Sequence, residues 1–410
     1  MELVVAPPRP IVQLGLRALG AMGCIGYAAL AVLSGLDHEA KEDLQRPALL
    51  DWPYSVAAEY SAAQSAITRH DATQALARAR TLVRHDPADS HSMSMYGLAL
   101  LEAHQPDKAR DAFSLAARLG WRDTVTQRYW FSEALRLGDA QQASQRLDAL
   151  LRLTPDLPDG SKLLRTILAY SEGRAAIADR LKNNPIWSVE FVAQMAHLDP
   201  DDLEARAEVV QRVGPGHWEC PQAANLVDAL FANGLLDDSA AVHRTVCSDS
   251  GKILNDGNFN ELSIGKDGSA LDWHLLRRGD MVVSINAETP RSHLLAMSIN
   301  APSTVQAVWQ ATTVGPGSYR VNWRMPDTSA KEASALLVSF DCNGAEDWAI
   351  NGTRLPGIAP NYEARFVVPK SCETPVLRLW LMPNHTITVA GMRIERLPGT
   401  GVPQHTPEAP

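Results

Sequence analysis

Small residues recur at a fixed interval in the first half of the chain. Ala75, Ala109 and Ala143 are each 34 positions apart, and Pro87 and Pro155, which follow helical stretches, are 68 apart, or two intervals. A small side chain at the same place in each interval lets two helices approach closely. Because a single helix pair cannot bury its apolar face, at least about three such units must stack on one another.

The stretch around these residues is helical in character. It is rich in Ala and Leu, is interrupted by Asp-Pro and Gly-Asp pairs, and carries Tyr96-Gly97 in one predicted helix and Phe113 in the next. A helix–turn–helix period of this length and register resembles the tetratricopeptide repeat (TPR) family. The resemblance implies a TPR-like α-solenoid over residues 55–250, less regular toward its end, with a concave groove for a protein partner. The sequence does not identify the groove residues.

A second constraint is a run of 19 residues without charge, from Ala18 to Leu36. At about 1.5 Å rise per residue, a helix of this length just spans a hydrocarbon core of roughly 30 Å. Arg9 and Arg17 precede the run, whereas residues 37–43 contain four acids and one base. The positive-inside rule therefore places the N-terminus in the cytoplasm and the remaining chain outside. We expect a bacterial inner-membrane protein with a single pass and the bulk of the chain in the periplasm. Its segments are a cytoplasmic tail at 1–17, a transmembrane signal anchor at 18–36 and a linker at 37–54.

Three other interpretations of this run stay open. A cleaved signal peptide is one, because Ala29-Leu30-Ala31 offers a small-x-small cleavage site. A lipoprotein signal is another, at Ala21-Met22-Gly23-Cys24, although the apolar run continues past Cys24. The third is a buried helix of a soluble protein, although polar positions are missing from every face. All but the last export the protein.

The cysteines fit an exported protein. Apart from Cys24, they form two local pairs, Cys220 with Cys247 and Cys342 with Cys372. An even number of cysteines suits disulfides in an oxidising compartment. The alternative is four buried thiols, since free cysteine packs well as a small apolar residue.

The second pair has additional support from strand alternation. Cys342 is in phase with Leu336, Val338 and Phe340, so its side chain should face inward, and a strand at 365–369 can return beside it and bring Cys372 close. We expect no metal site, because the chain has no Cys-x-x-Cys motif and we find no histidine at ligand spacing beside a cysteine.

From about residue 252 the sequence changes to short β-rich runs separated by turn residues. The clearest runs are Met281–Ile285, Tyr319–Arg324, Leu336–Asp341 and Val376–Leu381. About 145 residues with some eight strands predict an antiparallel β-sandwich of jelly-roll type over residues 252–397, followed by a disordered tail at 398–410. The predicted fold class is therefore multidomain: one transmembrane helix, a TPR-like α-solenoid and an antiparallel β-sandwich.

The β-region carries recognisable motifs. Residues 254–260 (Leu-Asn-Asp-Gly-Asn-Phe-Asn), then Leu271-Asp272-Trp273, then Gln310 and a Pro-Gly turn before Tyr319 resemble jelly-roll carbohydrate-binding modules and their galactose-binding-like relatives. The resemblance implies that residues 254–260 form the first strand and that the last strand, Ile387–Leu397, closes the sandwich against it. Many such modules hold a structural calcium ion with two acids that this chain lacks, since Asn260 replaces one and the last strand has no Asp. We therefore expect no calcium and no other cofactor.

Strand alternation also suggests a ligand site. Arg378 and Trp380 share one face of their strand, and Asn322 lies opposite to Val321 and Trp323 on another. Sugar sites combine an aromatic platform with charged or amide groups that bind hydroxyls. We predict that Trp380, Arg378 and Asn322 form a glycan-binding site. The alternative is that Trp380 only covers a neighbouring part of the chain.

The remaining observations limit the function. The chain has no GxSxG, HExxH or P-loop motif and no GxGxxG in a βαβ context, so we expect no enzyme activity. A net charge of −9 without a dense Lys/Arg block argues against nucleic-acid binding. By analogy, we expect a periplasmic scaffold of exopolysaccharide or capsule biosynthesis or export that binds envelope proteins through the TPR groove and polysaccharide through the sandwich. The alternatives are a protein-interaction scaffold with a purely structural sandwich and an unrecognised carbohydrate-active enzyme.

Overall fold

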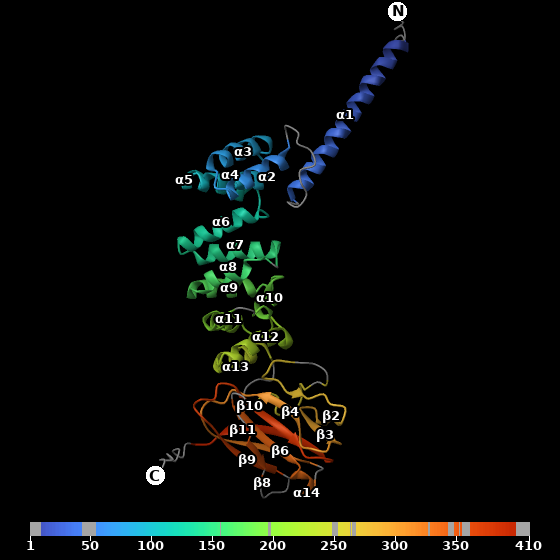
Figure 1. Ribbon diagram of the computed structural model, residues 1–410, viewed down its shortest axis with the longest axis vertical. Helices are drawn as coiled ribbons and strands as arrows, with labels where there is room; N and C mark the ends of the chain where they lie inside the picture. Colours follow the sequence, from blue (N-terminus) through green and yellow to red (C-terminus); the bar gives the residue numbers. More distant parts are fainter. Residues whose placement is uncertain are drawn as a thin grey trace, which may run out of the picture. The chain divides into compact units, whose positions relative to one another are not determined.

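The computed structural model describes residues 10–42, 55–155, 157–195, 198–247, 253–262, 264, 268–326, 329–342, 348–351, 353–354 and 361–398. Helices come first and two antiparallel sheets follow, which confirms the predicted order of an α region and a β-sandwich (Figure 1). By their internal contacts the residues divide into two compact units, Met1–Leu153 and Thr154–Pro410.

The first helix, α1, covers Pro10–Glu42. Its segment Ala18–Leu36 is long and apolar enough to cross a membrane, and none of it is buried inside the protein. The predicted helix is confirmed, and its role as an anchor stays a prediction.

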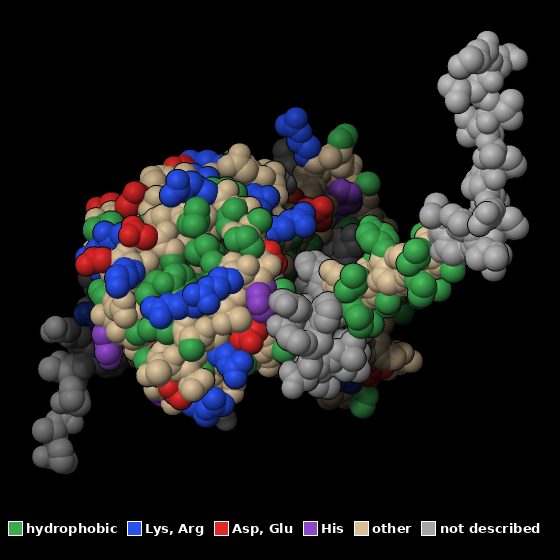
Figure 2. Space-filling view, turned by 90° about the horizontal axis from the view of Figure 1, so that it is seen from above, with side chains coloured by type: hydrophobic (Ala, Val, Ile, Leu, Met, Phe, Trp, Pro, Cys, Tyr) green, Lys and Arg blue, Asp and Glu red, His purple; other side chains and the backbone are tan. Residues whose placement is uncertain are grey.

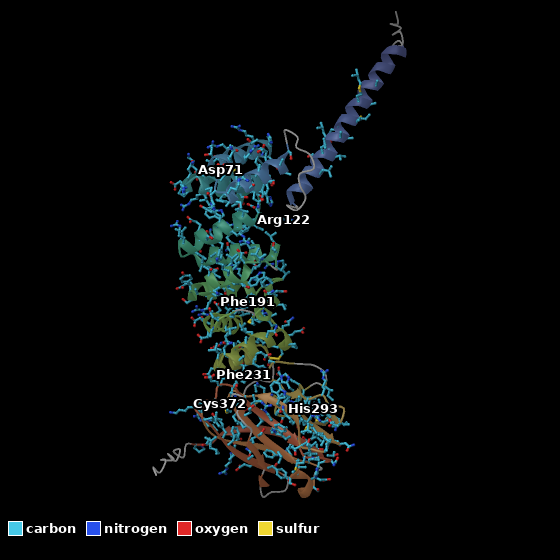
Figure 3. All side chains as sticks on the ribbon, in the orientation of Figure 1. Asp71, Arg122, Phe191, Phe231, His293 and Cys372 are labelled. Atoms are coloured by element: carbon cyan, nitrogen blue, oxygen red, sulfur yellow. A yellow bond between two sulfur atoms is a disulfide. The ribbon has the colours of Figure 1, made fainter. Side chains whose placement is uncertain are left out.

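Three helix pairs make up the rest of the first unit. They are α2 (Val56–Thr68) with α3 (Ala72–His85), α4 (Ser90–Glu102) with α5 (Pro106–Leu119), and α6 (Thr124–Arg136) with α7 (Ala140–Leu153). Ala75, Ala109 and Ala143 are fully buried at the same place in the second helix of each pair. The repeated small residue therefore does what its spacing predicts, because it allows each pair of helices to pack closely. Asp71, labelled in Figure 3, caps α3 by accepting a hydrogen bond from the Gln74 amide.

The second unit starts with further helices. They are α8 (Gly160–Leu168), α9 (Ser171–Leu181), α10 (Ser188–Ala193), α11 (Pro200–Val213), α12 (Cys220–Ala232) and α13 (Leu236–Val246). Phe191 and Phe231 are among their buried side chains (Figure 3). The predicted helical domain at 55–250 is thus divided between the two units. The change near residue 250 is a change of secondary structure, since α13 ends at Val246 and the first strand begins at His274.

The β-sandwich consists of two antiparallel sheets. One has the order β1-β4-β10-β6-β7 and the other has the order β2-β3-β11-β5-β9-β8. The bounds are β1 His274–Leu275, β2 Met281–Thr289, β3 Ser292–Ile299, β4 Val305–Ala311, β5 Gly317–Arg324, β6 Leu336–Cys342, β7 Trp348–Asn351, β8 Thr353–Arg354, β9 Asn361–Val368, β10 Pro375–Leu381 and β11 Thr386–Arg396, with the short helix α14 (Ala330–Ala333) before β6. A single apolar core lies between the sheets and includes Leu379, Val321 and Trp323. The four clearest predicted strands lie within β2, β5, β6 and β10.

The expected first strand is not a strand. Residues 254–260 form a loop in which Asp256 and Phe259 have positive φ. The Asp256 carboxylate accepts hydrogen bonds from the backbone N–H groups of Asn260, Glu261 and Leu262 at 2.6, 3.0 and 3.1 Å. This local capping competes with a sheet ladder for the same backbone groups. The last strand, β11, pairs with β3 and β5 instead, and its Met392 N–H donates to the loop, at the Gly257 carbonyl.

Both predicted disulfides are present. Cys220 and Cys247 have Cα atoms 4.9 Å apart, and Cys342 and Cys372 have Cα atoms 5.1 Å apart. The predicted neighbour of the Cys342 strand was wrong, however. β9 pairs with β5 in the other sheet, whereas Cys342 lies opposite Pro375 of β10, and Cys372 belongs to the turn that leads into β10. The disulfide forms because the turn between β9 and β10, rather than the predicted strand at 365–369, lies beside β6.

Candidate functional site

The predicted glycan site is divided between the two sheets. Leu377 and Leu379 of β10 and Val321 of β5 point into the common core, so their strand neighbours point outward. Arg378 and Trp380 therefore lie on the outer face of one sheet and Asn322 on the outer face of the other. With a core about 10 Å thick between sheets, these residues cannot contact one ligand. The prediction that Trp380, Arg378 and Asn322 form one site was wrong.

Arg378 and Trp380 are occupied by their own sheet. Trp380 is half-buried and donates its indole N–H to the Ser339 hydroxyl at 2.7 Å. Arg378 donates to Gln306 at 2.9 Å and forms an ion pair with the buried Asp341. These bonds connect β10 to β4 and β6 on either side. The two residues therefore stabilise the sheet.

Asn322 lies in a different place that the sequence did not reveal, a polar cleft of about 750 Å³ over the outer face of the second sheet. The strands β5, β9 and β11 supply most of its lining, and the β2–β3 hairpin and Asn258 supply the rest. β11 has an irregular register between Ala390 and Arg393, where Gly391 has a φ of 57°. Such a bulge bends a strand, and here it turns β11 from its pairing with β3 to its pairing with β5.

The centre of this cleft combines an amide, an acid and a base on adjacent strands. Asn322 of β5 lies opposite Glu363 of β9 on one side and opposite Arg393 of β11 on the other. Asn322 is partly exposed and Arg393 is exposed. Among the residues that the structure describes, Arg393 has no ionic partner. The row therefore offers both donors and acceptors to a ligand, with one available positive charge.

The other arginines of the cleft are held by acids. Arg324 donates through both of its terminal nitrogens to Glu288, at 3.0 and 2.7 Å, and Ser292 donates to the same carboxylate at 2.9 Å. The hydrogen bond from Arg324 holds the pKa of Glu288 below its usual value. Arg320 donates to Glu395 at 2.9 and 2.6 Å. The bidentate Arg324–Glu288 pair restricts the rotation of both side chains, so its donors and acceptors are fixed before a ligand arrives. Lys and Arg side chains are also interspersed with Asp and Glu side chains on the face of the molecule that Figure 2 shows.

The loop at residues 255–262 forms part of the cleft rim. Its Asn258 lines the cleft, and the Asn258 carbonyl accepts the His293 backbone N–H at 2.9 Å. The Asn260 side chain bonds to the His293 ring at 2.9 Å and to the Arg291 carbonyl at 3.0 Å. The motif that resembles the opening of a carbohydrate-binding module thus fixes a rim of the cleft. Aromatic residues contribute little accessible surface, because Trp323 and Tyr362, which also line the cleft, are 2% and 5% exposed.

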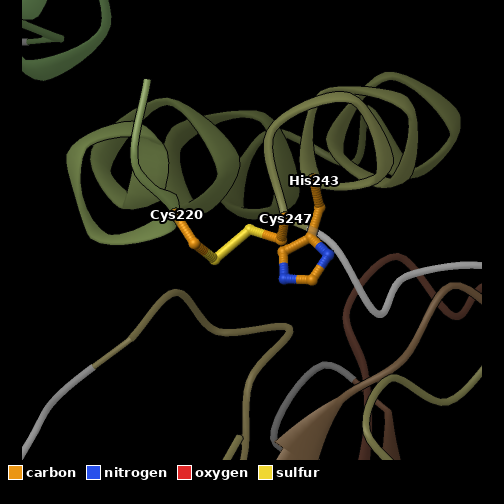
Figure 4. A group of neighbouring side chains, drawn as sticks. All are labelled: Cys220, His243 and Cys247. Atoms are coloured by element: carbon orange, nitrogen blue, oxygen red, sulfur yellow. A yellow bond between two sulfur atoms is a disulfide. The ribbon is translucent and has the colours of Figure 1, made fainter. Parts of the chain in front are cut away.

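A second cluster lies at the ends of α12 and α13. Cys220, His243 and Cys247 place one ring nitrogen and two sulfur atoms within 4.8 Å of one another (Figure 4). The statement that no histidine has ligand spacing to a cysteine was wrong. His243 precedes Cys247 by four positions, and residues i and i+4 share one face of a helix. This i, i+4 spacing of His243 and Cys247 would have predicted the cluster from the sequence.

Comparison with known proteins gives little guidance. No protein-family model and no curated protein matches the chain. Among solved structures, it is similar to the CBM22-1–GH10 modules of endo-1,4-beta-D-xylanase 10B from Clostridium thermocellum, at 15% identity over 31% of this chain and 26% of that chain, with a TM-score of 0.24. It is also similar to the enzymatically active domain of tailspike protein 4 from bacteriophage CBA120, at 10% identity over 37% of this chain and 22% of that chain, with a TM-score of 0.26. The chain spans about a quarter of the length of these structures. Neither similarity identifies a function.

Proposed function

We propose that the chain is a membrane-anchored periplasmic scaffold that binds a glycan in the polar cleft of its sandwich. The proposal includes a role in exopolysaccharide or capsule biosynthesis or export, with the helical region binding an envelope protein. It follows the resemblance to TPR proteins and to carbohydrate-binding modules that the sequence motifs suggest. The site differs from the one that strand alternation predicted, because it uses Asn322 without Trp380 and Arg378.

The observation that carries the glycan proposal is the row Arg393–Asn322–Glu363 at the centre of the cleft. Sugar hydroxyls both donate and accept, so a surface that alternates amide, carboxylate and guanidinium groups matches them. The ion pairs of Arg324 and Arg320 keep the surrounding groups in place and lower the entropy lost on binding. Because the exposed Arg393 has no ionic partner among the described residues, a glycan that carries carboxylate groups is favoured.

Binding is better supported than hydrolysis. Glycosidases need a carboxylic acid whose pKa is raised so that it can protonate the leaving oxygen. Of the cleft acids, Glu288 has its pKa lowered by Arg324, Glu395 is paired with Arg320, and Glu363 is paired with Arg365. The hydrogen bond from Arg324 favours the ionised form of Glu288, which accepts hydrogen bonds from hydroxyls but cannot act as a general acid.

The test is binding of the detergent-solubilised full chain to a uronic-acid polysaccharide and to a neutral polysaccharide. We expect retention of the acidic one, reduced at least about tenfold by Asn322→Ala or Arg393→Ala, the size expected for loss of one charge-assisted bond. Asn286→Ala is the matched control, because Asn286 is an exposed asparagine of the same sheet outside the cleft. Trp380→Ala should also leave retention unchanged. Equal retention by Asn322→Ala, Arg393→Ala and Asn286→Ala would remove the cleft from the proposal.

The anchor is supported by the uncharged segment Ala18–Leu36 of α1 and by the two disulfides, which suit an oxidising compartment. A reporter fused after Pro410 should be active only when it is exported, and the chain should stay in the membrane fraction after a carbonate wash. A cytoplasmic C-terminus contradicts the location. Loss of the chain from membranes with an active reporter instead indicates a cleaved signal.

The partner of the helical region is proposed from its surface. Leu115, Leu119, Trp121 and Leu137 are 40%, 39%, 53% and 63% exposed in the first unit, where a protein partner would cover them. The alternative of a sandwich that binds nothing is favoured by the hydrogen bonds of Trp380 to Ser339 and of Arg378 to Gln306, which lie within their own sheet. Absence of binding to both polysaccharides would support that alternative.

A further inference from the structure

The helical hairpin formed by α12 and α13 brings the start of one helix beside the end of the other. Cys220 is the first residue of α12, and Cys247 follows the last residue of α13, so the disulfide closes the open end of the hairpin. His243 lies one helical turn before Cys247, and Figure 4 shows its ring beside the bond between the two sulfur atoms. The second disulfide, Cys342–Cys372, has no such histidine among the described residues. The two bonds therefore have different surroundings in one chain.

His243 is held in an orientation typical of a metal ligand. Its ring nitrogen Nε2 lies 3.0 Å from the Asp272 carboxylate, whose other oxygen accepts from the Ser269 backbone N–H at 2.7 Å and hydroxyl at 2.9 Å. Because a carboxylate only accepts, Nε2 donates to Asp272, and Nδ1 is the nitrogen left to bind a metal when the ring is neutral. A carboxylate that orients a histidine in this way accompanies most histidine–metal bonds.

The remaining nitrogen is buried without a partner. His243 is 3% exposed, and its Nδ1 has no hydrogen-bond partner among the described residues. A buried polar atom without a partner destabilises a fold, and in native proteins such an atom often binds an ion or a water molecule. Cys247 is equally buried, at 4% exposed, whereas Cys220 is only partly buried. The cluster is thus closed on one side and accessible on the Cys220 side.

We propose that Cys220, Cys247 and His243 form a zinc site that opens when their disulfide is reduced. A dithiol attacks the accessible Cys220 sulfur, and its second thiol then releases Cys220, so that one disulfide and one dithiol become two cysteine thiols and one oxidised dithiol. Zn²⁺ binds as these thiols release two protons, with two thiolates and one imidazole as ligands and a fourth position for water. Asp272 is a positioning residue. The disulfide and the metal exclude one another, so the site responds to the redox state of the compartment.

Zinc needs a modest movement of the ligands. Zn–S bonds of about 2.3 Å and Zn–N bonds of about 2.0–2.1 Å place the three ligand atoms roughly 3.5–4 Å apart. The three atoms already lie within 4.8 Å of one another. The main change is therefore the separation of the two sulfur atoms after reduction, at the end of a hairpin where α13 already stops.

The experiment uses the full chain in detergent, reduced with dithiothreitol that is then removed without oxygen. Co²⁺ is the first probe, because tetrahedral Co²⁺ with thiolate ligands has a distinctive visible and charge-transfer spectrum. We expect one Co²⁺ per reduced chain, displaced by Zn²⁺, and none in the oxidised chain. Cys342→Ser/Cys372→Ser should bind as the wild type does, since it lacks only the other disulfide, whereas Cys220→Ser/Cys247→Ser should not bind.

Two variants distinguish the role of His243 as a metal ligand from that of Asp272 as a positioning residue. His243→Ala should lose the tetrahedral spectrum, and Asp272→Asn should keep the spectrum but weaken Zn²⁺ binding roughly 10–100-fold. Far-ultraviolet circular dichroism of each reduced variant reports whether the helices persist. Reduced wild-type chain without the Co²⁺ spectrum overturns the proposal, folded or not. An unchanged spectrum in His243→Ala overturns it as well, because the thiolates alone would then account for binding.

Discussion

The contact between Gly97 and Phe113 offers a sharp test of how the first unit is packed. Gly97 is buried in α4, and a Cβ atom there would lie 2.8 Å from two carbons of the Phe113 ring and 3.0 Å from a third. Ordinary carbon contacts are about 3.5–4.0 Å. The ring cannot move away easily, because it is fully buried and stacks on Tyr129 with a centroid distance of 4.0 Å. The informative variants are therefore Gly97→Ala, Phe113→Leu and the double substitution.

Two opposing effects determine the size of the result. Replacing a helical glycine with alanine stabilises a helix by about 1 kcal/mol. Overpacking a filled core destabilises by about 1–3 kcal/mol, and a ring held from both sides belongs at the upper end of that range. We expect Gly97→Ala to destabilise the unit by about 1–2 kcal/mol. In the Phe113→Leu background the contact disappears, so the same change should stabilise by up to about 1 kcal/mol. The coupling energy is then about 2–3 kcal/mol.

The assay is amide hydrogen exchange in the α4 and α5 peptides of the full chain, which reports local opening without requiring all parts to unfold together. Gly120→Ala is the control. Gly120 has an extended backbone with φ of 165°, and a Cβ there meets nothing within 4 Å. Exchange in sandwich peptides should not change in any variant. If Gly97→Ala slows exchange equally with Phe and with Leu at position 113, the ring does not limit the approach of α4 and α5.

Three further predictions concern the sandwich. Gly257→Ala should lower its free energy of unfolding by more than about 3 kcal/mol, because the new Cβ would lie 2.0 Å from the Met392 carbonyl oxygen, and a backbone atom cannot move aside cheaply; a thermal unfolding midpoint close to that of the wild type contradicts this. Cys342→Ser/Cys372→Ser should destabilise the sandwich by about 3–4 kcal/mol, because the disulfide no longer closes a loop of 30 residues in the unfolded chain. Non-reducing peptide mapping of the wild type should link the two cysteines, and free thiols at both sites refute the bond. Burial raises the pKa of Asp256 to about 6, so the folded chain binds the carboxyl proton of Asp256 more tightly than the unfolded chain does. The stability that this proton contributes is present below pH of about 4 and is lost as the pH rises through 6. The unfolding free energy of the wild type minus that of Asp256→Asn should therefore fall by about 2 kcal/mol between pH 4.5 and 7.5, and a rise over that range means that the three backbone N–H donors outweigh burial.

The sequence predicts well those features that depend on neighbours along the chain. The alternation in β5, β6 and β10 identifies their inward residues, because side chains of a strand point to opposite faces in turn. The spacing of Ala75, Ala109 and Ala143 identifies buried positions for a similar reason, since a repeated unit repeats its contacts. The cysteine pairs were found because each is separated by only a short connection.

The candidate site depended on information that alternation does not contain. Periodicity states which residues share a face of one strand, but it does not assign the strand to a sheet. Asn322 and Trp380 are both outward-facing, and only the pairing of β5 with β9 and β11, and of β10 with β4 and β6, separates them. The cleft also depends on Glu288, which reaches Arg324 from 36 positions away in the sequence. Such long-range pairs leave no local signal.

Asp272 illustrates how one motif residue connects two parts of the second unit. In the sequence it belongs to a Leu-Asp-Trp motif of the sandwich, whereas in the structure its carboxylate holds His243 of α13. The Asp228 carboxylate of α12 likewise accepts the Ala270 backbone N–H at 2.5 Å. Because both contacts join the helices to the segment before β1, the helices and the sandwich belong to one compact unit despite the change of secondary structure between them. Reduction of the Cys220–Cys247 bond would release the end of the α12–α13 hairpin but would leave both of these contacts in place. A metal ion bound by Cys220, Cys247 and His243 would then reconnect the ends of α12 and α13.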